Sequence, residues 1–210
     1  MKRFVLMATA VSMLTIGPTA NAAGCKYKQN ETDLFTKEKL VRTDWFDMTS
    51  WISGSFNSAI GNRHEISVAA SGEGRHNFVL VRIKLSDTTQ YRPDEADMYH
   101  ALFVPQGAPL FITLADESEV ELHAVKDVRG TTRVKYDHGT YVVSTNFINQ
   151  YRLGTDAADA LTGQDVIYIR LAAHSGRYGF VSDAGTIDFK VNKKGNAAFK
   201  QTISCLKQAR

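Results

Sequence analysis

Hydrophobic and polar residues alternate along most of the chain after residue 65. This period of two places successive side chains on opposite faces of an extended strand, so it is typical of strands with one buried face. The alternation predicts strands over residues 65–71, 78–86, 99–105, 165–173 and 186–191, and hairpins over 109–125 and 132–145. Because hairpins join neighbouring strands that run in opposite directions, most of the sheet is expected to be antiparallel.

Each predicted hairpin has its own turn signal. Asp116-Glu117 joins the arms of the first hairpin, and Asp137-His138-Gly139 joins those of the second. Short polar residues favour tight turns, and glycine readily adopts the left-handed conformation that many hairpin turns need. His138 is therefore interpreted as a turn residue that tolerates a positive φ, and the six histidines show no local signature of a cluster.

Two segments carry a helical pattern instead. Residues 155–163 predict a short helix that ends at Gly163, with Thr155 or Asp156 as its cap. The last segment has a candidate cap at Asn192 or Asn196 and one apolar stripe, formed by Phe199, Ile203 and Leu206. The sequence thus predicts an α+β fold, strand-rich with a mainly antiparallel sheet, a short helix near 155–163 and a C-terminal helix packed on the sheet.

The start of the chain has the pattern of a secretory signal. Lys2 and Arg3 precede an apolar run at 4–17, and Ala20-Asn21-Ala22 has the form of a cleavage site. The apolar run is shorter than the ~20 residues that cross a bilayer, and no second run of that length follows. We expect a signal peptide at 1–22, a polar N-terminal arm at 23–43 and one strand-rich domain at 44–210. Within that domain, 44–62 is expected to contain a strand.

Two cysteines, Cys25 and Cys205, lie near opposite ends of the expected mature chain. In an oxidising compartment two lone cysteines usually pair, which favours a disulfide that holds the arm against the final helix. Ala23-Gly24-Cys25 also resembles a lipoprotein cleavage box, although Ala22 stands where that box prefers leucine. Lipidation of Cys25 is therefore the alternative prediction.

Charge argues against a nucleic-acid partner. The formal net charge is +3, and it falls to +1 once residues 1–22 are removed, because that segment holds Lys2 and Arg3 and no acids. The remaining charges are interspersed, and Lys193-Lys194 is the densest basic spot. Nucleic-acid binding proteins usually show a basic stripe.

Three stretches carry a resemblance to known sequences: NETDLFTKEKLVRT after the first cysteine, APLFITLADESEVEL, and the closing order YRLG, IYIRL, IDFKV and FKQTISCL. In this order they resemble a family of uncharacterised exported bacterial proteins. The chain departs from that family at Glu117, where the hairpin turn usually carries glycine. The resemblance implies an exported, β-rich fold and no known activity.

The strongest local metal-ligand pattern is Glu119, Glu121 and His123. On a strand these three side chains project to one face, and carboxylates and imidazole are metal ligands. The same alternation is equally typical of an ordinary solvated face opposite Val120 and Leu122, and neighbours on one face lie ~7 Å apart. The residues therefore form a weak candidate site, and no cofactor is predicted.

Exposed aromatic side chains are the other candidates for recognition. Tyr136 and Tyr141 flank one hairpin turn, and Tyr168 and Tyr178 lie on later strands. Such residues can stack against a sugar or a peptide, or pack as cross-strand pairs. No nucleophile motif, phosphate loop or H-E-x-x-H pattern is present.

These observations predict an exported, non-catalytic protein, periplasmic or secreted, with a binding or envelope-assembly role. Its expected partner is an envelope protein or a glycan, and the localisation alternative is an outer-membrane lipoprotein anchored at Cys25. Two functional alternatives stay open: a secreted hydrolase whose site is assembled from distant residues, and a structural component of the envelope.

Overall fold

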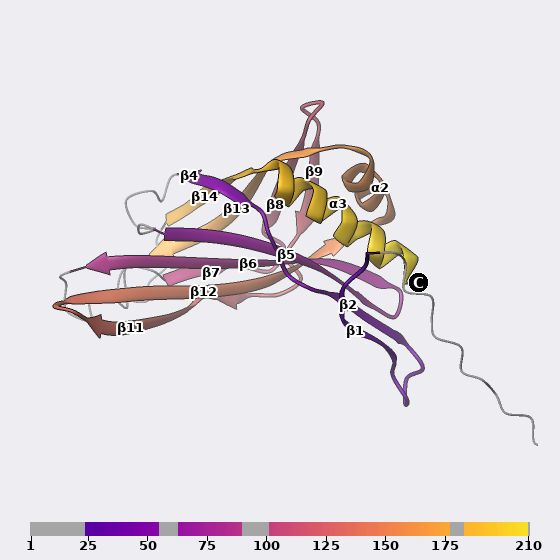
Figure 1. Cartoon of the computed structure of the whole chain (residues 1–210), viewed down its shortest axis with the longest axis horizontal. Coiled ribbons are helices and arrows are strands. Elements are labelled where there is room, and N and C mark those ends of the chain that lie inside the picture. Colours follow the sequence, from indigo (N-terminus) through magenta and orange to yellow (C-terminus); the bar gives the residue numbers. More distant parts are fainter. Residues whose placement is uncertain (1–23, 55–62, 90–100, 177–182, 210) are drawn as a thin grey trace, which may run out of the picture.

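The computed structural model describes residues 24–54, 63–89, 101–176 and 183–209 of the 210-residue chain. Over these residues the fold consists of two antiparallel sheets with seven strands each. The long strands of the first sheet run across Figure 1, and strands β8 and β9 of the second stand steeply to them. This arrangement confirms the predicted α+β class with mainly antiparallel sheet.

The first sheet, sheet A, has the order β1-β2-β5-β6-β12-β11, and β3 pairs with β5. Its strands are β1 (Tyr27–Thr32), β2 (Lys39–Thr43), β3 (Phe46–Asp47), β5 (Arg63–Glu73), β6 (His76–Thr89), β11 (Thr131–Asp137) and β12 (Thr140–Leu153). Strands β6 and β12 pair along thirteen consecutive positions, from Tyr141 opposite Thr89 to Leu153 opposite Asn77. They therefore form the continuous centre of the sheet.

The second sheet, sheet B, has the order β10-β7-β13-β14-β4, with β8 on β13 and β9 on β8. Its strands are β4 (Thr49–Gly54), β7 (Ala101–Val104), β8 (Pro109–Leu114), β9 (Glu119–His123), β10 (Val128–Arg129), β13 (Val166–Gly176) and β14 (Asp183–Val191). The two sheets meet where Ala124 bridges to Tyr151 and the Val125 amide donates to the Gln150 carbonyl at 2.8 Å. One side of the sandwich is therefore joined by backbone hydrogen bonds.

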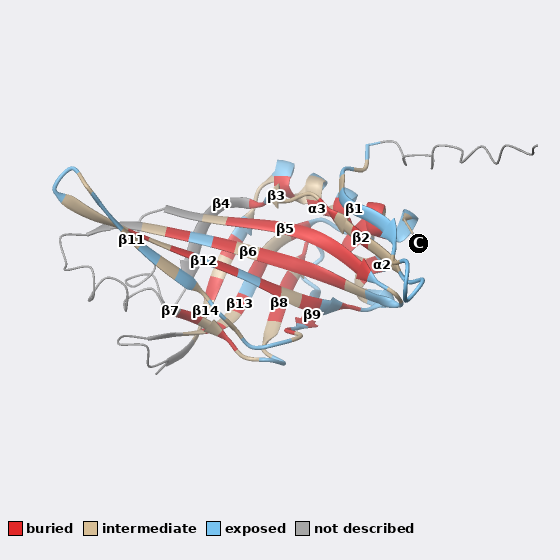
Figure 2. Cartoon of the chain, turned by 90° about the horizontal axis from the view of Figure 1, so that it is seen from below, coloured by how far each residue is buried: buried red, intermediate tan, exposed pale blue. Residues whose placement is uncertain are grey.

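The core lies between the sheets, where the inward faces of the strands meet. Figure 2 shows the buried residues as red stretches along the middle of the long strands. Strand β9 follows the predicted alternation, since Val120 and Leu122 are buried and their neighbours are exposed. The largest fully buried side chains are Tyr151, Phe147, Phe189 and Phe199. At ~25 cal/mol per Å² of apolar area, such aromatic side chains supply much of the driving force for folding.

Both predicted helices are present, as α2 (Thr155–Gly163) and α3 (Lys193–Gln208). The side chain of Asn192 caps α3 by accepting the Gly195 amide at 2.6 Å. Gly195 lets the helix approach the chain closely, because a Cβ there would lie 2.8 Å from Met48 Cα. The apolar stripe of α3 is buried as expected. The predicted cap of α2 is wrong, since Gly154 takes that position without a side-chain hydrogen bond.

The expected N-terminal arm is part of sheet A. Strands β1 and β2 form a hairpin, and β2 pairs with β5 through Arg42 opposite Ser71. The polar exposed face of β1 explains why the sequence pattern indicated an arm. The hairpin lies beside α3, to which the Cys25–Cys205 disulfide ties its base. The predicted disulfide is thus confirmed.

Segment 44–62 contains the expected strand structure, as β3 and β4, while residues 55–62 lie outside the described residues. Strand β12 continues to Leu153, eight residues beyond the predicted hairpin end at 145. Within the described part of the chain, no helix combines the length and the apolar character needed to cross a membrane.

Candidate functional site

Glu119, Glu121 and His123 all lie on the outer face of sheet B, as their spacing predicted. Each is exposed, and His123 Nε2 lies 3.6 Å from Glu121 Oε1. The other ring nitrogen of His123 lies 3.2 Å from the Gly107 carbonyl oxygen. Among the residues that the structure describes, no group of three or more His, Cys, Asp or Glu is placed to hold a metal ion. These side chains therefore form a solvated face with one exposed pair.

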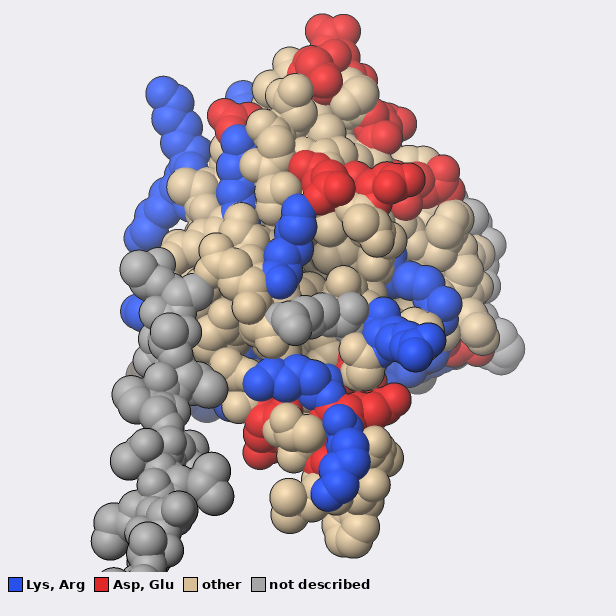
Figure 3. Space-filling model, turned by 90° about the vertical axis from the view of Figure 1, so that its right-hand side faces the viewer, with Lys and Arg blue, Asp and Glu red and all other residues tan. Residues whose placement is uncertain are grey.

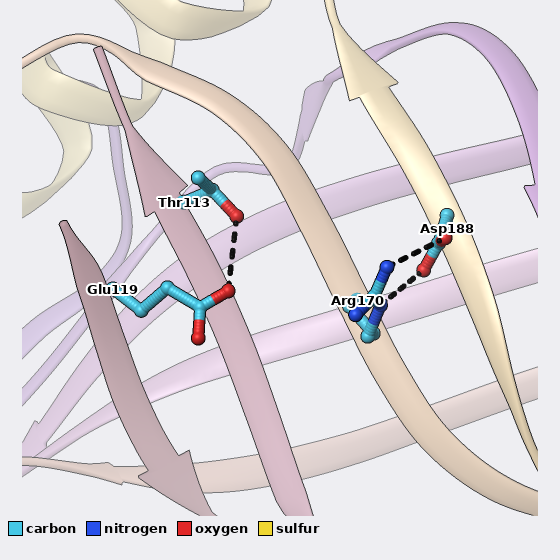
Figure 4. A network of polar contacts seen from close by, with 4 residues as sticks. All are labelled: Thr113, Glu119, Arg170 and Asp188. Carbon is cyan, nitrogen blue, oxygen red and sulfur yellow. Dashed lines mark hydrogen bonds and ion pairs between the residues drawn. The ribbon is translucent and has the colours of Figure 1, made fainter. Parts of the chain in front are cut away.

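A polar network covers the same face of sheet B, as Figure 4 shows. The Arg170 guanidinium donates from Nε and Nη2 to the two carboxylate oxygens of Asp188, at 2.8 and 3.1 Å. On the neighbouring strands the Thr113 hydroxyl donates to Glu119 at 3.5 Å. Hydrogen bonds from Arg170 to Asp188, together with the charge of that carboxylate, raise the pKa of Arg170. The network ties β13 to β14 and leaves Asp188 engaged by a cation.

The candidate tyrosines that the structure describes do not come together in one surface. Tyr136 and Tyr141 face each other across the β11–β12 hairpin, with ring centroids 5.0 Å apart, and Tyr136 is 62% exposed. Tyr168 lies on β13 in the other sheet, and Tyr178 lies outside the described residues. The contact between Tyr136 and Tyr141 is a cross-strand packing pair of the kind that stabilises hairpins.

Charge is unevenly distributed over the end of the molecule shown in Figure 3. Acidic side chains gather at the tip of the β8–β9 hairpin, at the top of the view. Basic side chains lie along the upper left edge and lower in the view, towards the β1–β2 hairpin, where acidic ones stand among them. Asp116 at the acidic tip accepts hydrogen bonds from the Ser118 hydroxyl and amide, and these lower the pKa of Asp116. The hydrogen bonds between Ser118 and Asp116 therefore stabilise the turn at this tip.

A groove on the outer face of sheet A is the strongest candidate for a binding site. It has a volume of about 350 Å³ and crosses β1, β2, β5, β6 and β12; its lining consists of Gln29, Leu40, Val41, Arg42, Ser71, Gly72, Glu73, Leu80, Ile148 and Gln150. This volume is at the lower end of the range typical of small-molecule sites. The groove brings together residues from positions 29 to 150 of the sequence.

The apolar part of the groove lies on the face opposite the core. Leu80 stands between Val79 and Val81, which belong to the core, and it pairs with Gln150 on β12. Ile148 points to the same outer face and is 48% exposed. An outward leucine and isoleucine on the central strands are unusual for a solvated face. They give the groove an apolar floor.

The polar part of the groove contains hydrogen-bonding atoms without partners. The Ser71 hydroxyl and Arg42 Nε are buried and make no hydrogen bond, and Ser71 is only 5% exposed. The two residues stand opposite each other in the β2–β5 register. Buried polar atoms are satisfied in the great majority of cases, so these two unpaired atoms distinguish the polar side of the groove.

The ring of Trp45 makes cation–π contacts with two arginines beside the groove. The Arg82 guanidinium carbon lies 4.6 Å from the Trp45 ring centroid, and that of Arg42 lies 5.6 Å from the same centroid. Arg82 also donates from Nη2 to the Ser67 hydroxyl at 3.0 Å, and Ser67 donates to Asp47 at 2.7 Å. Cation–π contacts of this kind restrict the side-chain conformations of both arginines.

Two other hollows have different linings. One, of about 380 Å³, lies over β5, β6 and β12 and contains the exposed Glu65–Lys84 ion pair. The other, of about 430 Å³, lies at the seam between the sheets and is lined by residues that include His123 and Arg152.

Sequence reasoning missed the groove. The signal available was the pair of apolar residues, Leu80 and Ile148, at positions that alternate with core residues. That signal identifies an outward face but cannot identify its neighbours, which come from strands far away in the sequence.

Comparisons with protein-family models, with curated proteins and with solved structures find no match to this chain. The resemblance to exported bacterial proteins therefore stays a prediction from the quoted stretches. Function is therefore inferred from the groove and its chemistry.

Proposed function

We propose that this protein is an exported, non-catalytic binding protein whose ligand lies in the groove on the outer face of sheet A. The single observation that carries the proposal is the groove itself, in which an apolar floor adjoins buried hydrogen-bonding groups without partners. An apolar surface with a few convergent polar groups is the usual composition of a ligand site.

Two further observations support export. The first 22 residues have the pattern of a secretory signal. The Cys25–Cys205 disulfide is of a kind that persists in oxidising compartments such as the periplasm or the cell exterior. Because the bond uses the sulfur that a lipid anchor would need, the proposal places the mature protein free in that compartment.

Thermal unfolding of the mature protein with fractionated envelope glycans tests this proposal. A ligand that binds only the folded state raises the melting temperature as its concentration increases. We expect at least one fraction to raise it for the native protein and not for Ile148→Glu, because the new carboxylate stands opposite Arg82 in the register and occupies the groove.

Tyr136→Ser is the matched control, since Tyr136 is an exposed apolar residue on β11, a strand that does not line the groove. It should respond to the same fraction as the native protein does. The proposal is wrong if no fraction acts, or if Ile148→Glu responds as strongly as the native protein.

A further inference from the structure

We propose that the groove binds an acidic saccharide, a sugar that carries a carboxylate or a phosphate, with its anionic group held by Arg42 and Ser71. This inference rests on the proposed function and names the class of ligand. It is argued from the unpaired donors, from the aromatic support of the arginines and from the rest of the lining.

Arg42 and Ser71 supply the anion subsite. They are directly opposed in the register, line the same groove, and each has a buried polar atom without a partner. A guanidinium donates two parallel hydrogen bonds to a carboxylate or a phosphate, and a hydroxyl adds a third. Among the described residues, no carboxylate lies within ion-pair distance of Arg42.

Arg82 does not line the groove, but it stands opposite the lining residue Ile148 and adds positive charge beside the subsite. It lies over the same Trp45 ring as Arg42, and its Nε is also buried without a partner. Because the indole ring and Ser67 hold its guanidinium in place, less side-chain entropy is lost when an anion binds. Both arginines therefore favour an anionic group at this end of the groove.

The remaining lining fits a sugar ring. Gln29 and Gln150 carry amides that both donate and accept, which suits hydroxyl groups. Leu40, Leu80 and Ile148 give an apolar surface for the C–H face of the ring. Glu73 is the one acid in the lining. It pairs with Leu40, two positions along the β2–β5 register from the pair formed by Arg42 and Ser71. The volume suits a terminal sugar, and the open groove lets a longer chain continue.

Amide NMR titration of the isotopically labelled mature protein tests the inference. The probes are glucuronate, glucose 6-phosphate and glucose, the last as the neutral match. We expect both acidic sugars to shift amides of residues 40–42, 71–73 and 148–150 at millimolar concentration, while glucose shifts them little. Arg42→Gln should weaken binding by about tenfold or more, since hydrogen bonds to a charged group are lost.

Arg133→Gln on β11 is the matched control, because it removes an equal charge from an exposed position away from the groove. It should leave the affinity unchanged, and the amide spectrum of Arg42→Gln should show that the fold is kept. The inference is overturned if neither acidic sugar binds, if glucose binds equally well, or if the shifts are scattered over the surface.

The two proposals can fail separately. One outcome is that an envelope fraction binds in a way that Ile148→Glu abolishes and Arg42→Gln does not change. In that case the groove is the binding site, but the ligand is not held through an anionic group at Arg42. If no fraction and no probe engages the groove, both proposals fail.

Discussion

The sulfur of Cys25 is bonded to that of Cys205, so that residues separated by 180 positions have Cα atoms 5.6 Å apart. Two hydrogen bonds lie next to the bond: the Tyr27 hydroxyl donates to the Cys205 carbonyl at 3.0 Å, and Gln201 donates to the Gly24 carbonyl at 2.7 Å. The start of sheet A is thereby fixed to the final helix, which in turn packs on the core.

The Cys25–Cys205 disulfide is expected to contribute strongly to stability, so that its removal should have a large effect. Closing so long a loop restricts the unfolded chain, which in the chain-entropy model is worth about 5 kcal/mol. The double variant Cys25→Ala, Cys205→Ala should lose up to that free energy of unfolding, as measured by guanidinium denaturation of the mature protein. A loss below about 1 kcal/mol would mean that the β1–β2 hairpin is held without the disulfide.

Glu117 is expected to limit the stability of the β8–β9 hairpin. Its φ is 68°, within the left-handed region that favours glycine, and its amide donates to the Leu114 carbonyl at 3.0 Å. Glu117→Gly removes the strain on Cβ and should stabilise the protein by about 0.5–1 kcal/mol. Gly139→Ala is the opposite test, because Gly139 has a φ of 86° and open space around it. It should destabilise the protein by a similar amount, and a change of stability in the same direction in both variants would contradict the strain argument.

Asp165 should make stability depend on pH in the acid range. Hydrogen bonds from Lys200, then from Asn196, and the charge of Lys200 lower the pKa of Asp165 from 3.8. Since the folded-state pKa lies below the unfolded one, the stabilisation is present above about pH 4 and is lost as the pH falls through the folded-state value. The melting temperature should therefore drop less between about pH 5 and about pH 3 in Asp165→Asn than in the native protein. An identical drop in both proteins would show that Asp165 does not contribute to the pH dependence of stability.

The buried hydroxyl of Tyr151 is expected to lower the stability of the protein. The residue is fully buried, burial raises the pKa of its phenol, and no aligned hydrogen bond joins its oxygen to a partner, although the Asn149 side chain lies nearby. Leaving a polar atom unpaired in a core costs about 1–3 kcal/mol. Tyr151→Phe keeps the ring and should raise the free energy of unfolding by up to about that amount, measured by denaturant unfolding. A clear loss of stability would show that the hydroxyl is hydrogen-bonded in the folded protein, with the Asn149 side chain as the nearest partner.

Local pattern was enough to predict most of the elements, because strand alternation and helix periodicity depend on neighbours in the sequence. Helix α2 has the predicted bounds, and the β8–β9 and β11–β12 hairpins form around the predicted turns. His138 adopts a positive φ of 45°, as a turn residue there was expected to do. The extension of β12 was missed because Asn149, a polar residue, takes a buried position in it and interrupts the alternation.

The groove could not be predicted in the same way. Arg42, Ser71 and Ile148 become neighbours only through the order β2-β5-β6-β12, and pairing between distant strands has no local signature. The contact of Arg82 with Trp45 spans 37 positions and depends on the turn between β2 and β3. By contrast, Glu119, Glu121 and His123 were easy to find because they lie on one strand, and for the same reason their side chains have few distant partners.

Hydroxyl-radical footprinting of the mature protein, with and without a stabilising envelope fraction, shows directly whether the ligand occupies the groove. The method reports which side chains lose solvent access on binding. The account predicts that oxidation of Leu40 and Ile148 in the groove decreases, while that of Tyr168 and Phe111 on the outer face of sheet B is unchanged. Protection of Tyr168 and Phe111 with no change at Ile148 would contradict it and place the ligand on the other sheet.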